Sequence, residues 1–312
     1  MDRVAITCTH LIRDIEDYRE NFAEAGLELV LPEVPGQELR GDELVSAMEG
    51  ISGVIAGDDH FTSDVLAQLP GLRVISKWGI GLDAIDLDDA AERGVTVTNT
   101  PGMFGNEVAE QGLAYLFALV RGIIDVDRTV RAGGWPKPVG RSLASLTVHV
   151  IGLGDIGRTL AEKLLALGLS VTGSDPSTES TTWAQPVGVE LGDAKALAAS
   201  ADAVMIAAPL NPATQGMVDA EFISAMKPGS WLINIGRGPI VVGAALADAI
   251  ESGHLLGAAL DVFEVEPLED DRLRQLPNLI LGSHNASNTY EACHRTHAQA
   301  IQNLIDNLSA SR

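Results

Sequence analysis

Short runs of apolar residues alternate along the chain with longer segments in which apolar residues recur at helical spacing. The apolar runs predict buried strands over 4–7, 53–56, 73–76, 95–98, 148–152, 170–175, 203–207, 231–236 and 279–282. Helical patterns lie between them, for example over 16–26, 63–69 and 158–168. Gly94, Gly168 and Gly253 each follow a helical segment, where a glycine often ends a helix. This alternation predicts an α/β fold with parallel sheets.

A boundary between two parts of the chain falls near residue 100. The turn-rich segment 99–106 leads into a long apolar-striped helix predicted over 107–122, and a polar connection with glycine and proline follows over 131–146. A second series of strands then begins at Val148. The chain ends in a further predicted helix over 291–308. Because chain termini often lie close together, we expect this helix to pack on the N-terminal domain.

Length and composition narrow the class of protein. A chain of 312 residues with 46% apolar and 21% charged residues is typical of a two-domain globular protein and excludes disorder. The net charge of −22 disfavours nucleic acid and anionic lipid as partners. Two isolated cysteines, Cys8 and Cys293, indicate a reducing compartment. We find no secretory signal pattern and no apolar stretch of about 18 residues, so we expect a cytoplasmic protein that does not enter a membrane.

The most specific motif is a glycine-rich loop between an apolar strand and a helix. Gly152, Gly154 and Gly157 form the pattern GxGxxG, with Asp155 and Ile156 inside it. The first glycine permits a tight turn, the second lets the backbone approach a pyrophosphate, and the third lets the helix pack closely on the strand. The free N–H groups of the helix N-terminus suit phosphate. All five residues are therefore candidate contacts of a dinucleotide cofactor.

An acidic residue at the end of the next strand indicates which dinucleotide binds. Asp175 lies 18 residues after Gly157, close to the spacing at which an acid binds the ribose 2′-hydroxyl. Its charge would repel a 2′-phosphate, and Pro176, Ser177 and Thr178 supply no arginine. The sequence thus favours NAD over NADP. The alternative, a glycine-rich turn with an unrelated surface acid, is disfavoured by the strand–turn–helix context.

Three residues with complementary chemistry follow later strands. Arg237, Glu266 and His284 each come just after an apolar strand, and ligands bind at the carboxyl edge of a parallel sheet. His284 is suited to act as general acid–base, and Glu266 to hold the imidazole and favour its charged form. Arg237 is suited to bind a substrate carboxylate. The trio predicts hydride transfer between a nicotinamide cofactor and a 2-oxo or 2-hydroxy acid.

Each of these residues has a simpler interpretation, and so have the other ionisable residues. Arg237 could be a surface cation at the start of a helix, and Glu264 and Glu266 could be solvated loop acids, which for Glu264 is the preferred interpretation. His294 and His297 have helical spacing suited to a metal, but further ligands are not apparent, so we predict a solvated helix face and no metal site. No role is assigned to four other histidines, His10, His60, His149 and His254.

From about residue 50 to 300 the sequence resembles the D-isomer-specific 2-hydroxyacid dehydrogenases, within them the phosphoglycerate dehydrogenase-like branch. The resemblance rests on segments 75–102, 151–158, 209–219, 234–242, 259–268 and 283–287, which occur in the family's order. It implies two Rossmann-like or flavodoxin-like domains with parallel sheets. A coenzyme domain of 101–284 would be inserted into a substrate domain formed by 1–100 and 285–312. The family also implies a homodimer, and the 107–122 helix is the expected interface element because its apolar stripe needs a cover.

The resemblance carries roles onto further residues. It implies that Arg237, Glu266 and His284 are catalytic and that Asp261 lies beside the nicotinamide carboxamide. It adds a set of residues near the cofactor: Pro209, Thr214 and Ile235. It places the loop of Lys77, Gly79, Ile80 and Gly81 around the substrate carboxylate, where successive backbone N–H groups suit an anion.

The chain departs from the family's pattern in ways that bear on the substrate. Ser283 stands where proline commonly precedes the catalytic histidine, and Ala207 stands where a histidine is common. Asp58 and Asp59 occupy a segment in which phosphoglycerate enzymes tend to have an arginine, and they would repel phosphate. We therefore expect a small unphosphorylated acid.

Two alternatives to this function stay open. One is 3-phosphoglycerate dehydrogenase or a reductase of another phosphorylated or phosphonylated 2-oxo acid. The other is an NAD(H)-sensing scaffold like the family's co-repressors. The three reactive residues are retained together, which argues against a sensor.

Overall fold

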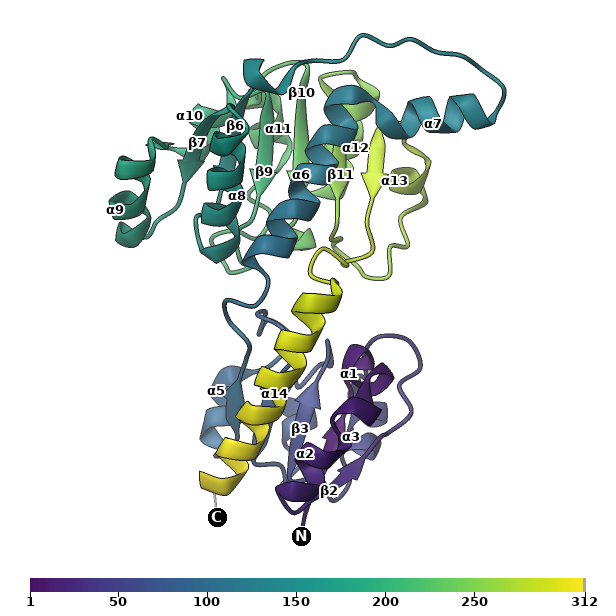
Figure 1. Ribbon diagram of the computed structural model, residues 1–312, viewed down its shortest axis with the longest axis vertical. Coiled ribbons are helices and arrows are strands. Elements are labelled where there is room, and N and C mark those ends of the chain that lie inside the picture. Colours follow the sequence, from purple (N-terminus) through teal and green to yellow (C-terminus); the bar gives the residue numbers. More distant parts are fainter. Residues whose placement is uncertain (311–312) are drawn as a thin grey trace. The chain divides into compact units, whose positions relative to one another are not determined.

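Two parallel β-sheets, each in its own unit of the chain, organise the structure (Figure 1). The computed structural model describes residues 1–310. Unit 1 is formed by Met1–Met103 and Thr289–Arg312, and unit 2 by Phe104–Asn288. These limits fall a few residues after the ones that the sequence suggests. The predicted fold class, two parallel-sheet α/β domains, is confirmed.

The sheet of unit 1 has five strands in the order β2-β1-β3-β4-β5, all parallel. The strands are β1 (Asp2–Ile6), β2 (Leu27–Val30), β3 (Gly53–Ala56), β4 (Val74–Lys77) and β5 (Thr96–Thr98). This order is that of flavodoxin-like folds. All the loops that follow the strands therefore leave from one edge of the sheet, which is where Lys77 and the glycine turn after it lie.

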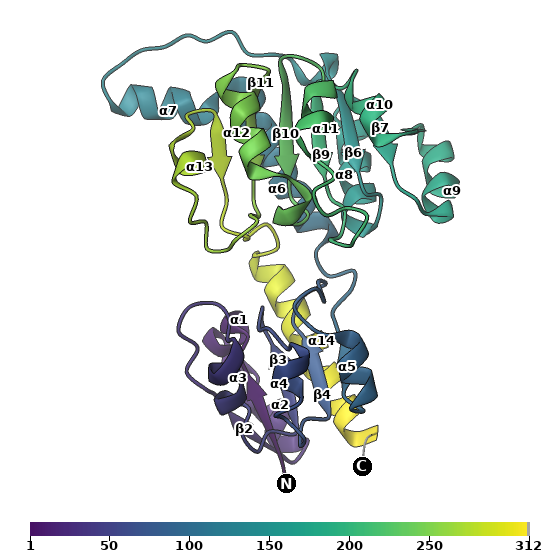
Figure 2. The same cartoon turned by 180° about the vertical axis from the view of Figure 1, so that it is seen from behind.

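Helices cover both faces of this sheet. They are α1 (Thr9–Arg13), α2 (Arg19–Glu24), α3 (Gly41–Ala47), α4 (Ser63–Leu66), α5 (Leu87–Glu92) and α14 (Tyr290–Ala310), with a 3₁₀ turn at Ile15–Asp17. In Figure 1, α1, α2 and α14 lie in front of the strands, and in Figure 2 α3, α4 and α5 do. The C-terminal helix α14 packs closely on β3, because a Cβ at Gly53 would lie 2.8 Å from a methyl carbon of Leu304. The last helix of the chain thus belongs to the N-terminal unit.

The sheet of unit 2 has seven parallel strands in the order β12-β11-β10-β9-β6-β7-β8. The strands are β6 (Thr147–Ile151), β7 (Ser170–Ser174), β8 (Glu190–Leu191), β9 (Ala203–Ile206), β10 (Ser230–Asn234), β11 (Leu255–Leu260) and β12 (Leu279–Leu281). The first six of these in chain order follow the Rossmann arrangement, and β12 extends it by one strand. The order reverses between β6 and β9, and in such sheets ligands bind outside the carboxyl ends at this point.

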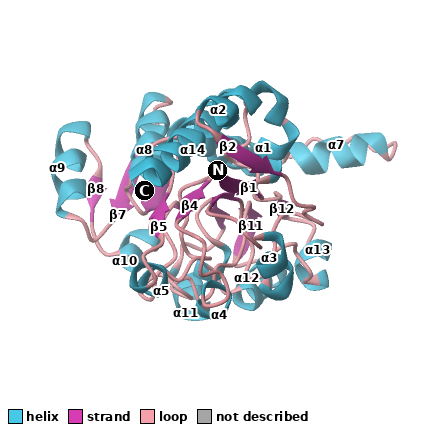
Figure 3. Ribbon diagram, turned by 90° about the horizontal axis from the view of Figure 1, so that it is seen from below, coloured by secondary structure: helices cyan, strands magenta, loops and turns pink. Residues whose placement is uncertain are grey.

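The helices of unit 2 also lie on both faces of their sheet. They are α6 (Gly105–Arg121), α7 (Ile123–Arg131), α8 (Asp155–Ala166), α9 (Thr178–Val187), α10 (Ala194–Ala198), α11 (Ala220–Ala225), α12 (Gly243–Glu251) and α13 (Asp271–Gln275), with 3₁₀ turns at Leu143–Ser145 and Gly238–Ile240. Helices α6 and α8 run side by side on one face (Figure 1), and α11 and α12 lie on the other (Figure 2). Helix α7 extends away from the rest of unit 2 (Figures 1 and 3).

Burial on both faces explains why the strands are visible in the sequence. Every residue of β3, β9 and β10 is buried, so these strands are continuous apolar runs rather than alternating ones. Two strands at sheet edges were not predicted. Strand β2 is half exposed and contains Glu28, and β8 has only two residues.

Two predicted helices differ from the structure, and a third helix was not predicted. The segment 16–26 is divided between a 3₁₀ turn and α2. Helix α4 ends at Leu66 rather than at residue 69, because Pro70 disfavours a helical conformation in the residue before it. Helix α7 was not predicted; it has no buried residue, although Ile123, Ile124 and Val130 give it an apolar side.

Candidate active site

The glycine loop has the geometry that the motif predicts. Gly152 has φ +89°, and a Cβ there would lie 2.6 Å from the Cα of Ala208. At Gly157 a Cβ would lie only 1.8 Å from the carbonyl oxygen of Gly152. A Cβ at Gly154, in contrast, would meet no atom within 4 Å. The first and third glycines are thus required by packing, and the second leaves open space at the N-terminus of α8 for a ligand phosphate.

Two residues inside the motif lie at the start of α8. Asp155 is its first residue and is exposed, and Ile156 is half-buried. Arg158, the last residue of the segment 151–158, is a further residue at this loop that was not predicted from the sequence. Its Nε donates a 2.7 Å hydrogen bond to the carbonyl oxygen of Leu153, so a guanidinium lies beside the loop. Its position directly after the last glycine of the motif was the available signal.

The carboxylate of Asp175 is fixed against the same loop. Its Oδ2 accepts a 2.7 Å hydrogen bond from the N–H of Leu153, and its Oδ1 accepts one of 2.8 Å from the N–H of Ser177. The strand end therefore presents an oriented negative charge next to the glycines. That is the arrangement in which a ribose hydroxyl is accepted and a phosphate is repelled.

The turn after β9 and the end of β10 hold three further candidate cofactor residues, Pro209, Thr214 and Ile235. The hydroxyl of Thr214 donates to the carbonyl oxygen of Pro209 at 2.7 Å and accepts from the N–H of Asn211 at 2.9 Å, which closes the turn. Ile235 is buried, and its side chain faces Gly112 of α6. A ligand contact by Ile235 would therefore have to come from its main chain.

Arg237 follows β10 in a tightly held turn. The side chain of Asn234 bridges this turn, accepting from the N–H of Gly236 and donating to the carbonyl oxygen of Arg237, both at 3.0 Å. A Cβ at Gly238 would lie 1.8 Å from the carbonyl oxygen of Phe263, so the turn is packed on the loop after β11. The half-buried guanidinium of Arg237 is thus carried by a rigid segment adjoining the loop that contains Glu266.

The structure joins Glu266 and His284 directly. Glu266 Oε2 lies 2.7 Å from His284 Nδ1, and Glu266 Oε1 accepts a 2.9 Å hydrogen bond from the N–H of Phe263. The two side chains are 34% and 37% exposed, so the imidazole is oriented but open to solvent. Since Nδ1 faces the carboxylate, Nε2 is the ring nitrogen that can exchange a proton with a substrate.

Asp261, at the end of β11, is engaged within the protein. It is 1% exposed, and its carboxylate accepts from the hydroxyl of Tyr115 at 2.8 Å and from the N–H of Ala286 at 3.0 Å. Its carbonyl oxygen accepts from the N–H of His284 at 2.7 Å. In this structure Asp261 supports the loop that carries the histidine.

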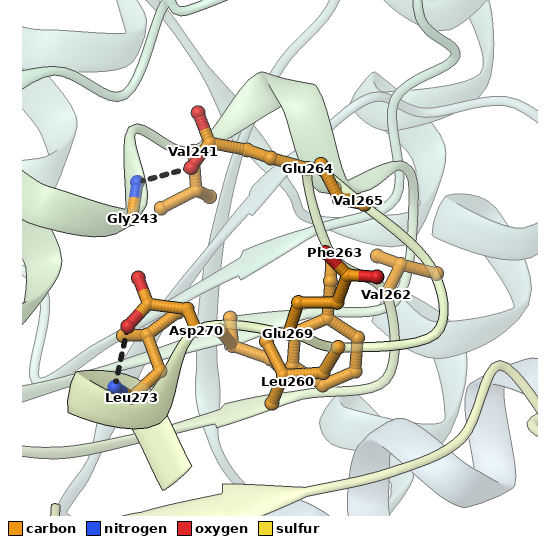
Figure 4. Close-up of a pocket in the computed structure, with 12 residues that line it drawn as sticks. Val241, Gly243, Leu260, Val262, Phe263, Glu264, Val265, Glu269, Asp270 and Leu273 are labelled. Atoms are coloured by element: carbon orange, nitrogen blue, oxygen red, sulfur yellow. Dashed lines mark hydrogen bonds between the residues drawn. The ribbon is translucent and has the colours of Figure 1, made fainter.

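Glu264 binds the N-terminus of a helix and is not part of the Glu266–His284 pair. It is exposed, and its carboxylate accepts a 3.0 Å hydrogen bond from the N–H of Gly243 at the start of α12 (Figure 4). It lines a mostly apolar cavity of about 170 Å³ on the loop after β11, together with Leu260, Val262 and Phe263. Asp270 lies at the same cavity and caps α13 through the N–H of Leu273 (Figure 4). The carboxylates of Glu264 and Asp270 are therefore engaged by helix N-termini.

In unit 1 the predicted substrate loop differs from expectation in two respects. The Nζ of Lys77 is 3.0 Å from Oδ1 of Asp58 and 2.9 Å from the carbonyl oxygen of Trp78, and the side chain is only 8% exposed, so its charge is neutralised. The N–H of Gly79 donates to the hydroxyl of Thr100 at 3.0 Å. An anion at this turn would therefore meet the N–H groups of Ile80 and Gly81.

The expectation that Asp59 repels a substrate phosphate is wrong. Asp59 is 1% exposed and accepts hydrogen bonds from the hydroxyl of Thr7 and the N–H groups of Leu39 and Gly57. Burial raises the pKa of its carboxyl group. Asp59 holds two loops together, and of the two acids Asp58 is the one that faces Lys77.

The helix face with His294 and His297 is not solvated, which corrects the prediction. His297 is fully buried; its Nδ1 accepts from the indole N–H of Trp78 at 2.9 Å, and its Nε2 lies 3.2 Å from Asp14. His294 Nδ1 lies 2.7 Å from the hydroxyl of Tyr18. Within residues 1–310 there is no group of three or more His, Cys, Asp or Glu side chains that could hold a metal ion. None of the helices in this range is long and apolar enough to cross a bilayer.

Comparison with known proteins finds similar sequences and similar folds. Residues 113–286 match the family model described as the NAD binding domain of D-isomer specific 2-hydroxyacid dehydrogenases. The D-3-phosphoglycerate dehydrogenase of Mycobacterium leprae is 37% identical over 78% of this chain, which spans only 46% of that relative. The 2-ketogluconate reductase of Gluconobacter oxydans is 35% identical, over 86% of this chain and 84% of the relative. Among solved structures, the TT0316 protein of Thermus thermophilus has a TM-score of 0.86 and 31% identity, covering 99% of this chain and 97% of that one.

Proposed function

The chain belongs to the D-isomer specific 2-hydroxyacid dehydrogenase family, and we propose that it transfers a hydride between NAD and C2 of a small 2-hydroxy or 2-oxo acid. The observation that carries the proposal is the 2.7 Å contact of Glu266 with His284 in the same unit as the glycine loop. When bound, the nicotinamide supplies or accepts the hydride. The protein must then manage the proton and the substrate's charge.

His284 manages the proton. In the direction of reduction, the imidazolium donates the proton on Nε2 to the oxygen of C2 while hydride adds to the carbon, and a 2-hydroxy acid results. Glu266 stays ionised and stabilises the imidazolium through Nδ1. In the direction of oxidation the neutral ring accepts the proton from the hydroxyl. Arg237 is proposed to bind the substrate carboxylate and to polarise the carbonyl group.

The proposed cofactor site consists of the glycine loop, Asp175 and the turn after β9. The open space at Gly154 and the N-terminus of α8 suit the pyrophosphate, and Arg158 adds a positive charge there. Asp175 would accept hydrogen bonds from the ribose and would repel a 2′-phosphate. We therefore propose NAD rather than NADP as the preferred cofactor.

We propose that unit 1 is the substrate domain and that Ile80 and Gly81 bind an anionic group of the substrate. Because Asp58 neutralises Lys77, this loop lacks the net positive charge that a phosphorylated substrate would require. The preferred substrate is then an unphosphorylated acid. Similarity to D-3-phosphoglycerate dehydrogenases keeps the phosphorylated substrate as the second candidate.

Steady-state kinetics on a panel of acids tests this proposal. NADH oxidation is followed with glyoxylate, hydroxypyruvate, pyruvate, 2-ketogluconate and 3-phosphohydroxypyruvate. We expect turnover with one or more of the unphosphorylated acids. A preference for the phosphorylated acid would contradict the substrate assignment. An absence of turnover across the panel with intact NADH binding would instead favour the sensor function.

We also propose a homodimer. The expected interface element, α6, packs one face within unit 2, while Leu113, Phe117 and Leu119 stay only half-buried, so it remains one candidate for the interface. A second candidate is α7 with the loop after it, where exposed apolar side chains lie at Ile123, Ile124, Val130, Trp135 and Val139. Light scattering should give the mass of a dimer for the wild type, and Trp135→Ser should weaken it. A monomer at all concentrations would contradict this proposal.

A further inference from the structure

A buried tyrosine on α6 contacts the residue that supports the histidine loop. Tyr115 is 6% exposed, and its hydroxyl donates a 2.8 Å hydrogen bond to Oδ1 of Asp261. Burial is the largest effect on the pKa of Tyr115 and raises it; a hydrogen bond with the side chain of Gln111 opposes this shift, and the negative charge of Asp261 adds to it. The hydroxyl therefore stays protonated and remains a hydrogen-bond donor throughout the pH range of an enzyme assay.

Asp261 in turn holds the backbone of the histidine loop at two points, His284 and Ala286. Its carbonyl oxygen accepts from the N–H of His284 at 2.7 Å, and its Oδ2 accepts from the N–H of Ala286 at 3.0 Å. His284 has φ +55°, an uncommon value for a residue other than glycine. Such a conformation persists where surrounding contacts determine it, and Asp261 supplies two of them.

Gly282 shows that the contact between Tyr115 and Asp261 is built into the packing. A Cβ at Gly282 would lie 2.3 Å from the hydroxyl oxygen of Tyr115 and 2.2 Å from Oδ1 of Asp261. A larger residue at this position would force the two oxygens apart. The glycine at 282 therefore makes room for the tyrosine–aspartate pair directly before the loop that carries His284.

We propose that Tyr115 is a positioning residue for His284, acting through Asp261. The hydroxyl fixes the carboxylate of Asp261, and Asp261 fixes the backbone of 284–286, which sets the direction of the imidazole toward Glu266. The inference rests on the proposed role of His284 in proton transfer. It adds a residue from α6 that makes no contact with the reacting groups.

The test is Tyr115→Phe, which removes only the hydroxyl. We expect kcat for the best 2-oxo acid to fall about tenfold, as for the loss of a hydrogen bond to a charged group. The dissociation constant of NADH should stay within about twofold of the wild type, because the cofactor site keeps its residues. Tyr18→Phe is the matched control: it removes a hydroxyl that lies 2.7 Å from His294 in unit 1, and kcat should not change.

A second variant disrupts the same pair from the other side. Gly282→Ala places a Cβ against both oxygens and should also lower kcat with little effect on NADH binding. If Tyr115→Phe fails to fold, as judged by circular dichroism, Gly282→Ala provides the test of the positioning role. A changed NADH affinity with unchanged kcat in either folded variant would mean that Asp261 serves the cofactor, and would overturn the proposal.

A spectroscopic measurement separates this proposal from the proposed function. The imidazole signals of His284 are identified in NMR spectra by their loss in His284→Ala. They should shift in Tyr115→Phe and stay in place in Tyr18→Phe, whether or not a substrate has been found. Unshifted signals in Tyr115→Phe would overturn the positioning role. Shifted signals in a chain without turnover would leave the positioning role standing while the proposed function fails.

Discussion

Replacement of Glu266 by glutamine should alter the chemistry of His284 without altering the shape of the site. In the wild type the carboxylate joins two donors, the N–H of Phe263 at 2.9 Å and His284 Nδ1 at 2.7 Å. The N–H of Phe263 can only donate, so the single amide oxygen of the new glutamine side chain must face it. The amide NH₂ group then faces Nδ1 and can only donate, so the proton of the neutral ring moves to Nε2.

The magnitude follows from the lost interaction. A hydrogen bond to a charged group contributes about 1.5–3 kcal/mol, and each 1.4 kcal/mol is a factor of about ten. The site is about one-third exposed, with side-chain values of 34% and 37%, so solvent screening favours the lower end. We therefore expect Glu266→Gln to lower kcat for reduction by about 10- to 30-fold. The dissociation constant of NADH should change by less than about twofold.

The assay is a pH profile of kcat for the best 2-oxo acid. Reduction needs the protonated imidazole, and Glu266 stabilises that form, so the fall of activity at high pH should move to lower pH in the variant. Glu264→Gln is the matched control, because Glu264 caps α12 and does not contact His284. The reasoning is refuted if Glu266→Gln keeps the wild-type kcat and pH profile, or if Glu264→Gln impairs the enzyme equally.

Three further predictions concern the cofactor site and the sheet beneath it. Asp175→Ala should raise the ratio of kcat/KM for NADPH to that for NADH at least tenfold; an unchanged ratio would show that its charge does not select the cofactor. Gly157→Ala should lower both the melting temperature and the NADH affinity, since its Cβ would strike the carbonyl oxygen of Gly152. Gly154→Ala should lower the NADH affinity alone, because a Cβ there meets no protein atom within 4 Å. An equal fall of the melting temperature in the two variants would contradict this prediction. His149 is fully buried, and burial lowers its pKa from 6.5 to about 4, so the unfolded chain binds a proton between these values and the folded chain does not. The contribution of His149 to the free energy of unfolding is complete above pH 6.5 and decreases by about 3 kcal/mol as the pH falls to 4. Urea unfolding should therefore show a difference in the free energy of unfolding between wild type and His149→Gln that shrinks over this range. A difference that stays constant would contradict the prediction.

Much of the fold could be predicted because parallel sheets bury their strands on both faces. Strands such as β9 and β10 are therefore continuous apolar runs that stand out from their flanks. Strand β2 lies at a sheet edge and is half exposed, so its apolar run is short and was not predicted, and helix α7 was also not predicted although its sequence is amphipathic. Their positions depend on neighbours that local patterns do not specify.

The site likewise has features that the local sequence predicts and features that depend on contacts between residues far apart in the chain. The glycine loop and the pairing of Glu266 with His284 follow from residue type and position after a strand. The neutralisation of Lys77 by Asp58, the burial of Asp59 and the contact of Tyr115 with Asp261 involve residues 19, 52 and 146 positions from their partners. Sequence spacing carries no information on such contacts, which depend on how the sheets are assembled.

The central claim is that His284 transfers the proton that accompanies the hydride, and His284→Ala tests it most directly. The measurement pairs the single-turnover rate of NADH oxidation, with the best acid of the panel, with the dissociation constant of NADH for the same preparation. We predict that the rate falls at least about 100-fold while the dissociation constant stays within about twofold. A rate close to that of the wild type, or a loss of NADH affinity as large as the loss of rate, would contradict the assignment.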